Sequence, residues 1–151
     1  MSKARSELTE AEQGGEFLFH GSPKELDQLE PRQAFRYDEK LGKMVEDGEQ
    51  SVCATHLADI AIFRALVNHD NAPTEHDSEF GSPVEDNSFC HLGASHGTLD
   101  QVRGKVGYVH LLDRKDFSRH SPMEWRSSNI VVPVKSIKVT YEDLPDTIKI
   151  L

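Results

Sequence analysis

The sequence predicts a small α+β domain whose sheet is mainly antiparallel. The chain has 151 residues, which fits one domain and leaves little room for a second. One longer apolar segment, 57–67, has apolar residues on nearly every side of a helix and is predicted to be a buried helix. Several strands with few helices favour an α+β architecture. The predicted strands are short segments at 17–20, 52–55, 105–112, 130–134 and 136–141, with 124–126 as the edge of another.

Residues 1–16 are predicted to form a flexible N-terminal arm that carries no core. This segment is polar and ends in Gly14 and Gly15, which is typical of a loose terminus. Residues 17–151 then make up one domain. Within it, residues 24–50 mix a few apolar positions with many charges and show no sustained period, so mostly loop is expected there.

A long irregular acidic insertion is predicted at residues 69–102. Residues 65–102 contain no Lys or Arg, whereas Asp and Glu accumulate there together with Pro and Gly. A segment of this kind inside a compact domain is often a lid or a binding loop. Simple disorder fits the same composition, and both interpretations stay open.

Charge and hydropathy disfavour several classes of protein. Seventeen Lys and Arg against 26 Asp and Glu give a net charge of -9, which makes a nucleic acid an unlikely partner unless basic residues cluster locally. No apolar run approaches the ~20 residues that cross a bilayer, and the N-terminus lacks the apolar stretch of a secretory signal. We therefore expect a cytoplasmic protein without a membrane partner, with reduced thiols at Cys53 and Cys90.

The first candidate site lies where the apolar segment 17–20 ends in His20 and continues into Gly21 and Ser22. A histidine at a strand end can hydrogen-bond a ligand, and the missing side chain of Gly21 lets a flat ligand lie against the backbone. Backbone N–H and C=O groups there could pair with a carboxamide. The pattern therefore indicates the floor of a nucleotide-like pocket. The alternative is a histidine that only hydrogen-bonds across a strand–turn junction.

The second candidate is Glu124, which stands directly ahead of an apolar strand. A carboxylate at the rim of a cleft stabilises a cation that forms on a bound sugar. The alternative is a solvated glutamate paired with Arg126 or Lys135.

No metal site is predicted. Several histidines and two cysteines supply ligand types, but no Cys-x-x-Cys or His-x-x-x-His pair occurs, and the adjacent Cys90 and His91 make a poor chelate. The chain also lacks the phosphate loop of NTPases, the Gly-x-Gly-x-x-Gly turn of dinucleotide-binding folds and the Gly-x-Ser-x-Gly elbow of hydrolases.

Three patches in order along the chain resemble the ADP-ribosyltransferase superfamily, specifically the His-Tyr-Glu branch that includes diphtheria toxin and the poly-ADP-ribose polymerases. FLFHGSP at 17–23 is similar to the first motif, a strand ending in His followed by Gly and Ser or Thr. SVCATHLADIAIFRAL at 51–66 is similar to the second, a strand followed by a helix with spaced alanines. MEWRSSNIVVPVKSIKV at 123–139 is similar to the third, a glutamate that opens a strand. The resemblance implies a split antiparallel sheet with a few helices.

The resemblance also implies roles for individual residues. His20 would bond ribose hydroxyls of NAD, and Gly21 would hold the nicotinamide amide through its backbone, with Ser22 as a neighbour. Glu124 would bond the nicotinamide ribose and offset oxocarbenium charge, so His20 and Glu124 are the expected catalytic residues. The second motif completes the expected NAD-binding set with Cys53, Thr55 and Phe63.

The chain departs from the branch at Cys53, which aligns with a tyrosine that stacks on nicotinamide and offers no aromatic face itself. Either another ring, such as Phe63 or Trp125, takes over, or nicotinamide is not held in the usual way. Pro122 stands two places before Glu124, where arginine-modifying members carry an acidic residue or glutamine. An arginine acceptor is therefore disfavoured.

We accordingly expect a NAD-dependent ADP-ribosyltransferase that moves ADP-ribose from NAD to an unidentified protein or nucleic-acid acceptor. The alternative is a catalytically inactive module of the same fold that binds NAD or ADP-ribose. A third hypothesis, a relative of the RNA 2′-phosphotransferases, ranks below both. Those enzymes hold phosphates with clustered Arg and Lys, whereas the basic residues here are scattered along the sequence.

Overall fold

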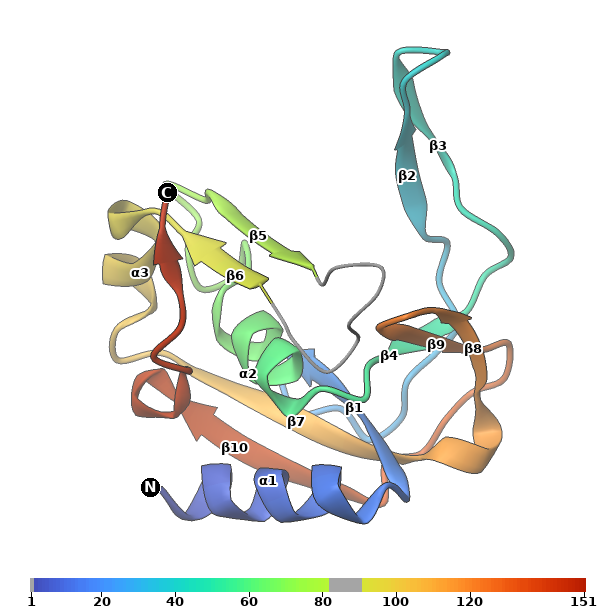
Figure 1. The fold of residues 1–151 in the computed structure, drawn as a ribbon, viewed down its shortest axis with the longest axis horizontal. Helices are drawn as coiled ribbons and strands as arrows, with labels where there is room; N and C mark the ends of the chain where they lie inside the picture. Colours follow the sequence, from blue (N-terminus) through green and yellow to red (C-terminus); the bar gives the residue numbers. More distant parts are fainter. Residues whose placement is uncertain (1, 82–90) are drawn as a thin grey trace.

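The computed structural model describes residues 2–81 and 91–151 and has an α+β fold. Within these residues, small and mostly antiparallel sheets are accompanied by three α-helices (Figure 1). The helices are α1 Lys3–Gly14, α2 Ala58–Leu66 and α3 His96–Val102, with short 3-10 turns η1 Arg114–Asp116 and η2 Tyr141–Asp143. The strands are β1 Phe17–Ser22, β2 Phe35–Asp38, β3 Lys43–Glu46, β4 Val52–Ala54, β5 Ser78–Gly81, β6 His91–Ala94, β7 Val106–Asp113, β8 Ser118–Ser121, β9 Glu124–Ser127, β10 Lys135–Thr140 and β11 Lys149–Ile150.

Two antiparallel three-stranded sheets are joined at their edges. One has the strand order β1-β7-β10 and the other β4-β9-β8. The edge strand β1 meets the edge strand β4 at a single bridge, in which Phe19 and Thr55 exchange backbone hydrogen bonds of 2.7 and 2.9 Å. This bridge fixes how the sheet that carries His20 sits against the sheet that carries Glu124.

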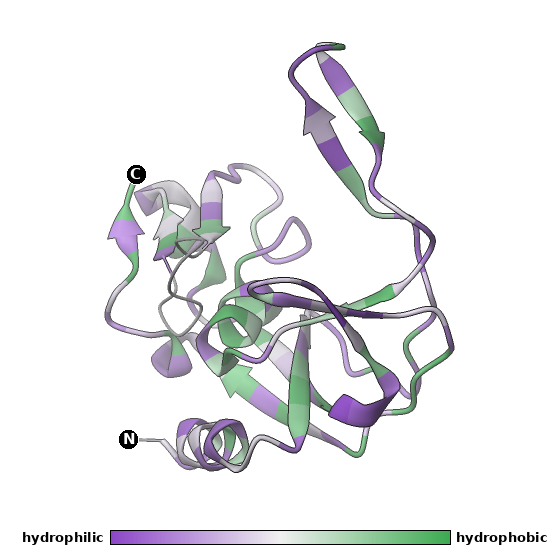
Figure 2. Ribbon diagram, turned by 45° about the vertical axis from the view of Figure 1, so that its right-hand side comes forward, coloured by the Kyte–Doolittle hydropathy of each residue, from purple (hydrophilic) through white to green (hydrophobic). Residues whose placement is uncertain are grey.

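Helix α2 lies directly on the first sheet because two glycines leave room for it. A Cβ added at Gly21 of β1 would overlap the carbonyl oxygen of Ala61, and one added at Gly107 of β7 would overlap the carbonyl oxygen of Ala65. Helix backbone and strand backbone are therefore in contact, with no side chain between them. Figure 2 shows the apolar residues concentrated on α2 and on the strands beneath it.

The prediction of a coreless N-terminal arm is wrong, because residues 3–14 form helix α1 and contribute to the core. The side chain of Leu8 is fully buried and packs in one cluster with Phe19 and Val139. Ala4 and Ala11 pack against the same cluster, and their spacing from Leu8 places all three on one face of the helix. This apolar face is narrow and made mostly of alanine, so the overall composition of the segment is polar and did not indicate a buried helix.

The glycine that indicated a loose terminus instead ends this helix. Gly15 has a φ of 72° in the left-handed region, and its N–H bonds the carbonyl oxygen of Glu12. At the other end, the side chain of Ser2 accepts a hydrogen bond from the backbone N–H of Arg5. Arg5 also pairs with Asp59 of α2 at 2.9 Å, which ties α1 to the body of the protein.

Residues 24–50, expected to be mostly loop, contain the β2–β3 hairpin. Its strands pair from Phe35 to Glu46 as a two-stranded sheet that stands away from the body of the molecule (Figure 1). Tyr37 and Met44, which are cross-strand partners, are exposed together with Phe35. Because neither face of the hairpin is covered, no alternation of apolar and polar residues is required, and periodicity gave no signal for it.

The prediction of an irregular insertion at 69–102 is also wrong where the structure describes it. Strands β5 and β6 pair antiparallel, β11 adds parallel to β6, and α3 follows. The apolar side chains of this region, including Leu92 and Val102, form a core cluster with Phe63 of α2. A few buried residues therefore order an otherwise acidic segment. Residues 82–90 of the predicted insertion lie outside the described residues.

The predicted strands at the other positions and the helix at 57–67 are confirmed with small shifts at their ends, but 130–134 is not a strand. Val131 forms a single bridge with Leu29 and is buried, while its apolar neighbours are exposed. Pro133 has no N–H to donate to a ladder. The segment is therefore anchored by the buried side chain of Val131 and does not form a strand.

Replacing Leu8 with Ala should lower the free energy of unfolding by about 2–5 kcal/mol, because it leaves a cavity in the core. Urea denaturation followed by circular dichroism measures the change. Glu10→Ala, at an exposed position of the same helix, is the control and should change the free energy by less than about 0.5 kcal/mol. Unchanged stability of Leu8→Ala would mean that α1 adds nothing to the core.

Replacing Gly107 with Ala should destabilise the protein by about 1–3 kcal/mol, because the added methyl group forces α2 away from β7. The same urea titration measures this effect. Gly81→Ala is the matched control, since a Cβ there meets no described atom within 4 Å. If both variants unfolded at the same urea concentration, the close contact between α2 and the sheet would be refuted.

Candidate functional site

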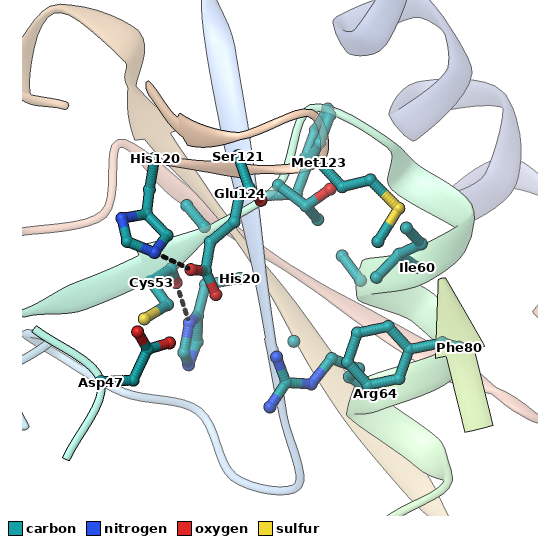
Figure 3. Close-up of a pocket in the computed structure, with 15 residues that line it drawn as sticks. His20, Asp47, Cys53, Ile60, Arg64, Phe80, His120, Ser121, Met123 and Glu124 are labelled. Carbon is teal, nitrogen blue, oxygen red and sulfur yellow. Dashed lines mark hydrogen bonds and ion pairs between the residues drawn. The ribbon is translucent and has the colours of Figure 1, made fainter. Parts of the chain in front are cut away.

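His20 and Glu124, although far apart in the sequence, line the same cavity. Its volume is about 260 Å³, and its walls come from β1, β4, α2 and the turn that leads into β9 (Figure 3). His20 and Glu124 both interact with Cys53. His20 bonds the backbone of Cys53. Burial is the main cause that raises the pKa of the Cys53 thiol, and the negative charge of Glu124 is the next.

A second cavity of about 890 Å³ adjoins the first. Small-molecule sites commonly measure about 300–1,000 Å³, so the pair is of a size that takes a nucleotide-like ligand. Ser22 and Phe63 line only the larger cavity, and Thr55 lines only the smaller. All the predicted site residues therefore border one or both cavities. The residues shared by the two cavities are His20, Gly21, Cys53, Arg64 and Phe80.

His20 is a neutral imidazole that presents a hydrogen-bond acceptor. Its Nδ1 lies 2.8 Å from the carbonyl oxygen of Cys53, to which it must donate. Burial is the main cause that lowers the pKa of His20 to about 4. The hydrogen bond to Cys53 acts to raise the pKa, and the charges of Arg64 and Arg32 make smaller contributions that lower it. Nε2 consequently carries a lone pair and can accept a hydrogen bond from a ligand hydroxyl.

Gly21 offers its backbone edge rather than free space above its Cα. The position of a Cβ is filled by α2, so the expectation that a flat ligand lies there is wrong for that face. Hydrogen bonding alternates along antiparallel strands, so Gly21 directs its N–H and C=O to the same edge of β1 as Phe19, which uses its own on Thr55. Gly21 lines both cavities, and this edge supplies a donor and an acceptor that suit a carboxamide.

The hydroxyl of Ser22 is used inside the protein. It lies 2.9 Å from Nε2 of His110 and also donates to the carbonyl oxygen of Lys24. His110 is fully buried, and its Nδ1 lies 2.7 Å from the hydroxyl of Ser136. These contacts link β1, β7 and β10 beside the cavity, so Ser22 stabilises the strand end and is not presented to a ribose as expected.

Thr55 and Cys53 also serve the local structure. The hydroxyl of Thr55 accepts a hydrogen bond from the backbone N–H of Leu57 at 3.2 Å, just ahead of α2. The thiol of Cys53 lies 3.9 Å from the hydroxyl of Ser51. Burial and then the charge of Glu124 raise its pKa, so Cys53 is a neutral thiol rather than an activated nucleophile.

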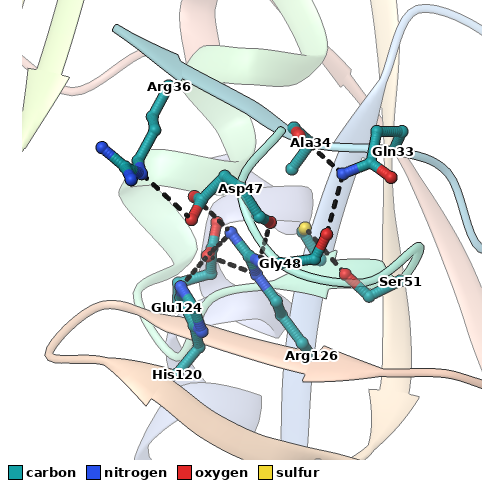
Figure 4. Close-up of polar contacts among 10 residues, drawn as sticks. Gln33, Ala34, Arg36, Asp47, Gly48, Ser51, His120, Glu124 and Arg126 are labelled. Carbon is teal, nitrogen blue, oxygen red and sulfur yellow. Dashed lines mark hydrogen bonds and ion pairs between the residues drawn. The ribbon is translucent and has the colours of Figure 1, made fainter. Parts of the chain in front are cut away.

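Glu124 is held by Arg126, which also binds the base of the β2–β3 hairpin (Figure 4). Nε and Nη2 of Arg126 both lie 2.8 Å from Oε2 of Glu124. The same guanidinium donates to the backbone carbonyl and the carboxylate of Asp47 at 2.7 and 2.9 Å. Nε2 of His120 lies 3.8 Å from Oε2. No described residue hydrogen-bonds Oε1 of Glu124, which leaves one carboxylate oxygen for a ligand.

The two interpretations of Glu124 are therefore compatible, because it is ion-paired and also lines the cavity. Lys135, the other expected partner, pairs with Glu7 instead. Burial acts to lower the pKa of Arg126, but Asp47 and Glu124 together raise it above its ordinary value. The guanidinium stays charged. Asp47 is also paired with Arg36 at 4.0 Å, so the two carboxylates are balanced by two guanidinium groups.

Neither ring expected to replace the missing tyrosine is well placed to do so. Trp125 lines neither cavity, and Phe63 is only 1% exposed within a core cluster. Phe80 of β5 lines both cavities and is 43% exposed. The guanidinium of Arg64 lies 5.0 Å from the centroid of its ring (Figure 3). Phe80 is therefore the ring available for stacking on a ligand.

Sequence reasoning missed four residues of this site, namely Arg64, Phe80, Asp47 and His120. Arg64 could have been found from the sequence, because it is the one cation in an apolar helix. Burying an unpaired charge is unfavourable, so its side chain must reach solvent or a polar cavity. The others belong to segments that reach the cavity only through the tertiary fold, and no local pattern marks them.

Among residues 2–81 and 91–151, no group of three or more His, Cys, Asp or Glu side chains could hold a metal ion. In the same residues, no helix has the length and apolar character needed to cross a membrane. Cys53 is a free thiol, and Cys90 lies outside the described residues.

Comparison with known proteins adds no family assignment. The chain matches no protein-family model, no curated protein and no solved structure.

His20 should make the stability of the protein depend on pH. Its pKa of about 4 in the folded protein lies below the ordinary 6.5. As pH falls from 6.5 toward 4, the unfolded chain binds a proton that the folded chain does not, and folding loses free energy. Urea denaturation across this range should show the protein losing stability relative to His20→Gln. A stability difference that is constant with pH would argue against a buried neutral imidazole.

Proposed function

We propose that the protein transfers ADP-ribose from NAD to an acceptor. The observation that carries the proposal is the convergence of His20, Gly21 and Glu124, the residues to which the resemblance assigns NAD, on one cavity. A chance likeness of three short segments gives no reason for them to meet. The neutral Nε2 of His20 and the free Oε1 of Glu124 supply the hydrogen-bond acceptors that ribose hydroxyls need.

The chemistry of the proposed reaction makes modest demands on the protein. The bond between ribose and nicotinamide breaks with nicotinamide leaving as a neutral amine, so no strong general acid is required. The reaction needs a carboxylate near the positive charge that develops on ribose, and a site shielded from water. Glu124 supplies the carboxylate. The acceptor nucleophile then bonds to the ribose carbon and gives up its proton.

Arg126 has two opposing effects on this function of Glu124. It orients the carboxylate through one hydrogen bond and one ion-pair contact to the same oxygen, and it offsets part of the charge that would stabilise a cation. Asp47 shares the same guanidinium, so the positive charge of Arg126 is not directed at Glu124 alone. The proposal therefore assigns Arg126 and Asp47 to positioning and not to bond cleavage.

A second candidate function is binding of NAD or ADP-ribose without turnover. It is favoured by Cys53, which lines both cavities where the branch carries a ring that stacks on nicotinamide. A neutral thiol holds a flat ring less firmly than an aromatic face does.

The test measures nicotinamide release from NAD, with water as the acceptor. Glu124→Gln should reduce the rate about a hundredfold, the usual effect of removing one preorganised electrostatic contact. Glu10→Gln, which removes one carboxylate from an exposed site on α1, is the control and should retain the full rate.

The outcomes separate the two candidates. Equal rates for the unmodified protein and Glu124→Gln would remove the proposed catalyst. Saturable NAD binding in calorimetry without nicotinamide release would favour the binding module. Absence of NAD binding would contradict both.

A further inference from the structure

We propose that Arg64 and Arg32 form a phosphate-binding site in the larger cavity, beside His20, and that this site takes the diphosphate of an ADP-ribose-containing ligand. The identity of the ligand rests on the proposed function. The site itself rests on where these two cations lie, on the absence of a carboxylate that pairs with either of them among residues 2–81 and 91–151, and on the charge of the cavity wall.

Arg64 is the only exposed residue of α2. The residues on both sides of it, from Ile60 to Val67, are buried, so the helix is fixed in place by its packing. Its side chain points into the cavity and lies against the ring of Phe80 (Figure 3). It forms no ion pair with any carboxylate in the described part of the chain. A guanidinium on a fixed helix that lies against an aromatic ring and pairs with no described carboxylate is well suited to bind an anion.

Arg32 approaches the same cavity from a different segment. Its backbone is fixed by two hydrogen bonds with Ser51, of 3.0 and 2.9 Å, next to β4. Its guanidinium has no hydrogen-bond or ion-pair partner among residues 2–81 and 91–151. The charges of Arg64 and Arg32 both act to lower the pKa of His20. Arg64, Arg32 and His20 all line the larger cavity, so one ligand bound there can contact both cations.

The wall of the larger cavity is basic although the chain is acidic. Its described lining holds three Lys or Arg residues, Lys24, Arg32 and Arg64, and two acidic residues, Glu30 and Asp70. The whole chain has 17 Lys and Arg against 26 Asp and Glu. The basic residues that are scattered along the sequence are thus partly collected on one wall, which favours an anionic ligand.

The chemistry of the two guanidinium groups suits a diphosphate. A guanidinium can donate two parallel hydrogen bonds to phosphate oxygens, and two guanidinium groups can hold two linked phosphates. His20 adds no charge of its own because it is neutral. The anionic carboxylate of Glu124 lines only the smaller cavity. Phosphates in the larger cavity would therefore lie apart from the acid, with the rest of the ligand reaching toward it.

The experiment measures the affinity of ADP-ribose by isothermal titration calorimetry. Arg64→Gln and Arg32→Gln should each weaken binding at least about tenfold, because each removes a charge-assisted contact. Lys115→Gln removes one positive charge at an exposed site that lines neither cavity, and should leave the affinity within about twofold. Arg64→Lys keeps the charge but loses the planar fork, so it should give an intermediate affinity.

A second measurement does not depend on variants. Raising the concentration of sodium chloride should weaken ADP-ribose binding to the unmodified protein, as expected for an ionic contact at a partly exposed site. Binding that does not respond to salt, or Arg64→Gln and Arg32→Gln variants with unchanged affinity, would overturn the inference. Absence of ADP-ribose binding to the unmodified protein would overturn it as well.

These outcomes are distinct from those of the proposed function. If ADP-ribose binds through the two arginines but no nicotinamide is released, the phosphate site stands and the enzymatic proposal falls. If nicotinamide is released through Glu124 but the arginine variants bind and react as the unmodified protein does, the enzymatic proposal stands and the phosphate site falls.

Discussion

The close contact of α2 with the sheet is the constraint on which the rest of the structure depends. Gly21 and Gly107 occupy neighbouring strands, and the helix carbonyls of Ala61 and Ala65 fill the space that side chains would need. Gly21, Ala61 and Arg64 all line the cavity beside β1, so this contact forms part of the cavity wall. It also explains why a glycine follows His20 on grounds of packing alone. The same glycine then leaves its backbone edge to a ligand, so one residue serves the fold and the site.

Sequence patterns predicted the elements that are buried and contiguous. Strand β1 and helix α2 are predictable because nearly all of their apolar residues are buried and follow one another without interruption. Helix α1 was missed because its buried stripe is mainly alanine around Leu8, and the β2–β3 hairpin was missed because it buries nothing. Local hydrophobic patterns indicate which residues are buried. Elements that bury few apolar side chains therefore cannot be predicted from such patterns.

The candidate site could be predicted only in part for a related reason. His20 and Glu124 belong to segments that carry the resemblance. Glu124 opens β9, whereas His20 lies within β1, which continues to Ser22 and does not end at the histidine as expected. Asp47 and Phe80 lie outside those segments and reach the cavity from a hairpin base and from a small separate sheet. The partners of a charged residue depend on long-range folding. This is also why the pairing of Glu124 with Arg126, two residues away, was open from sequence and is settled by geometry.

One guanidinium links the protruding hairpin to the acid in the cavity. The guanidinium of Arg126 donates to the backbone carbonyl of Asp47 at the base of the hairpin. The same guanidinium also pairs with an oxygen of Glu124. A two-stranded ribbon has little rigidity of its own, so its tilt is governed by its base. The tilt of the hairpin and the position of the Glu124 carboxylate are consequently coupled. If either one moves, Arg126 transmits part of that movement to the other.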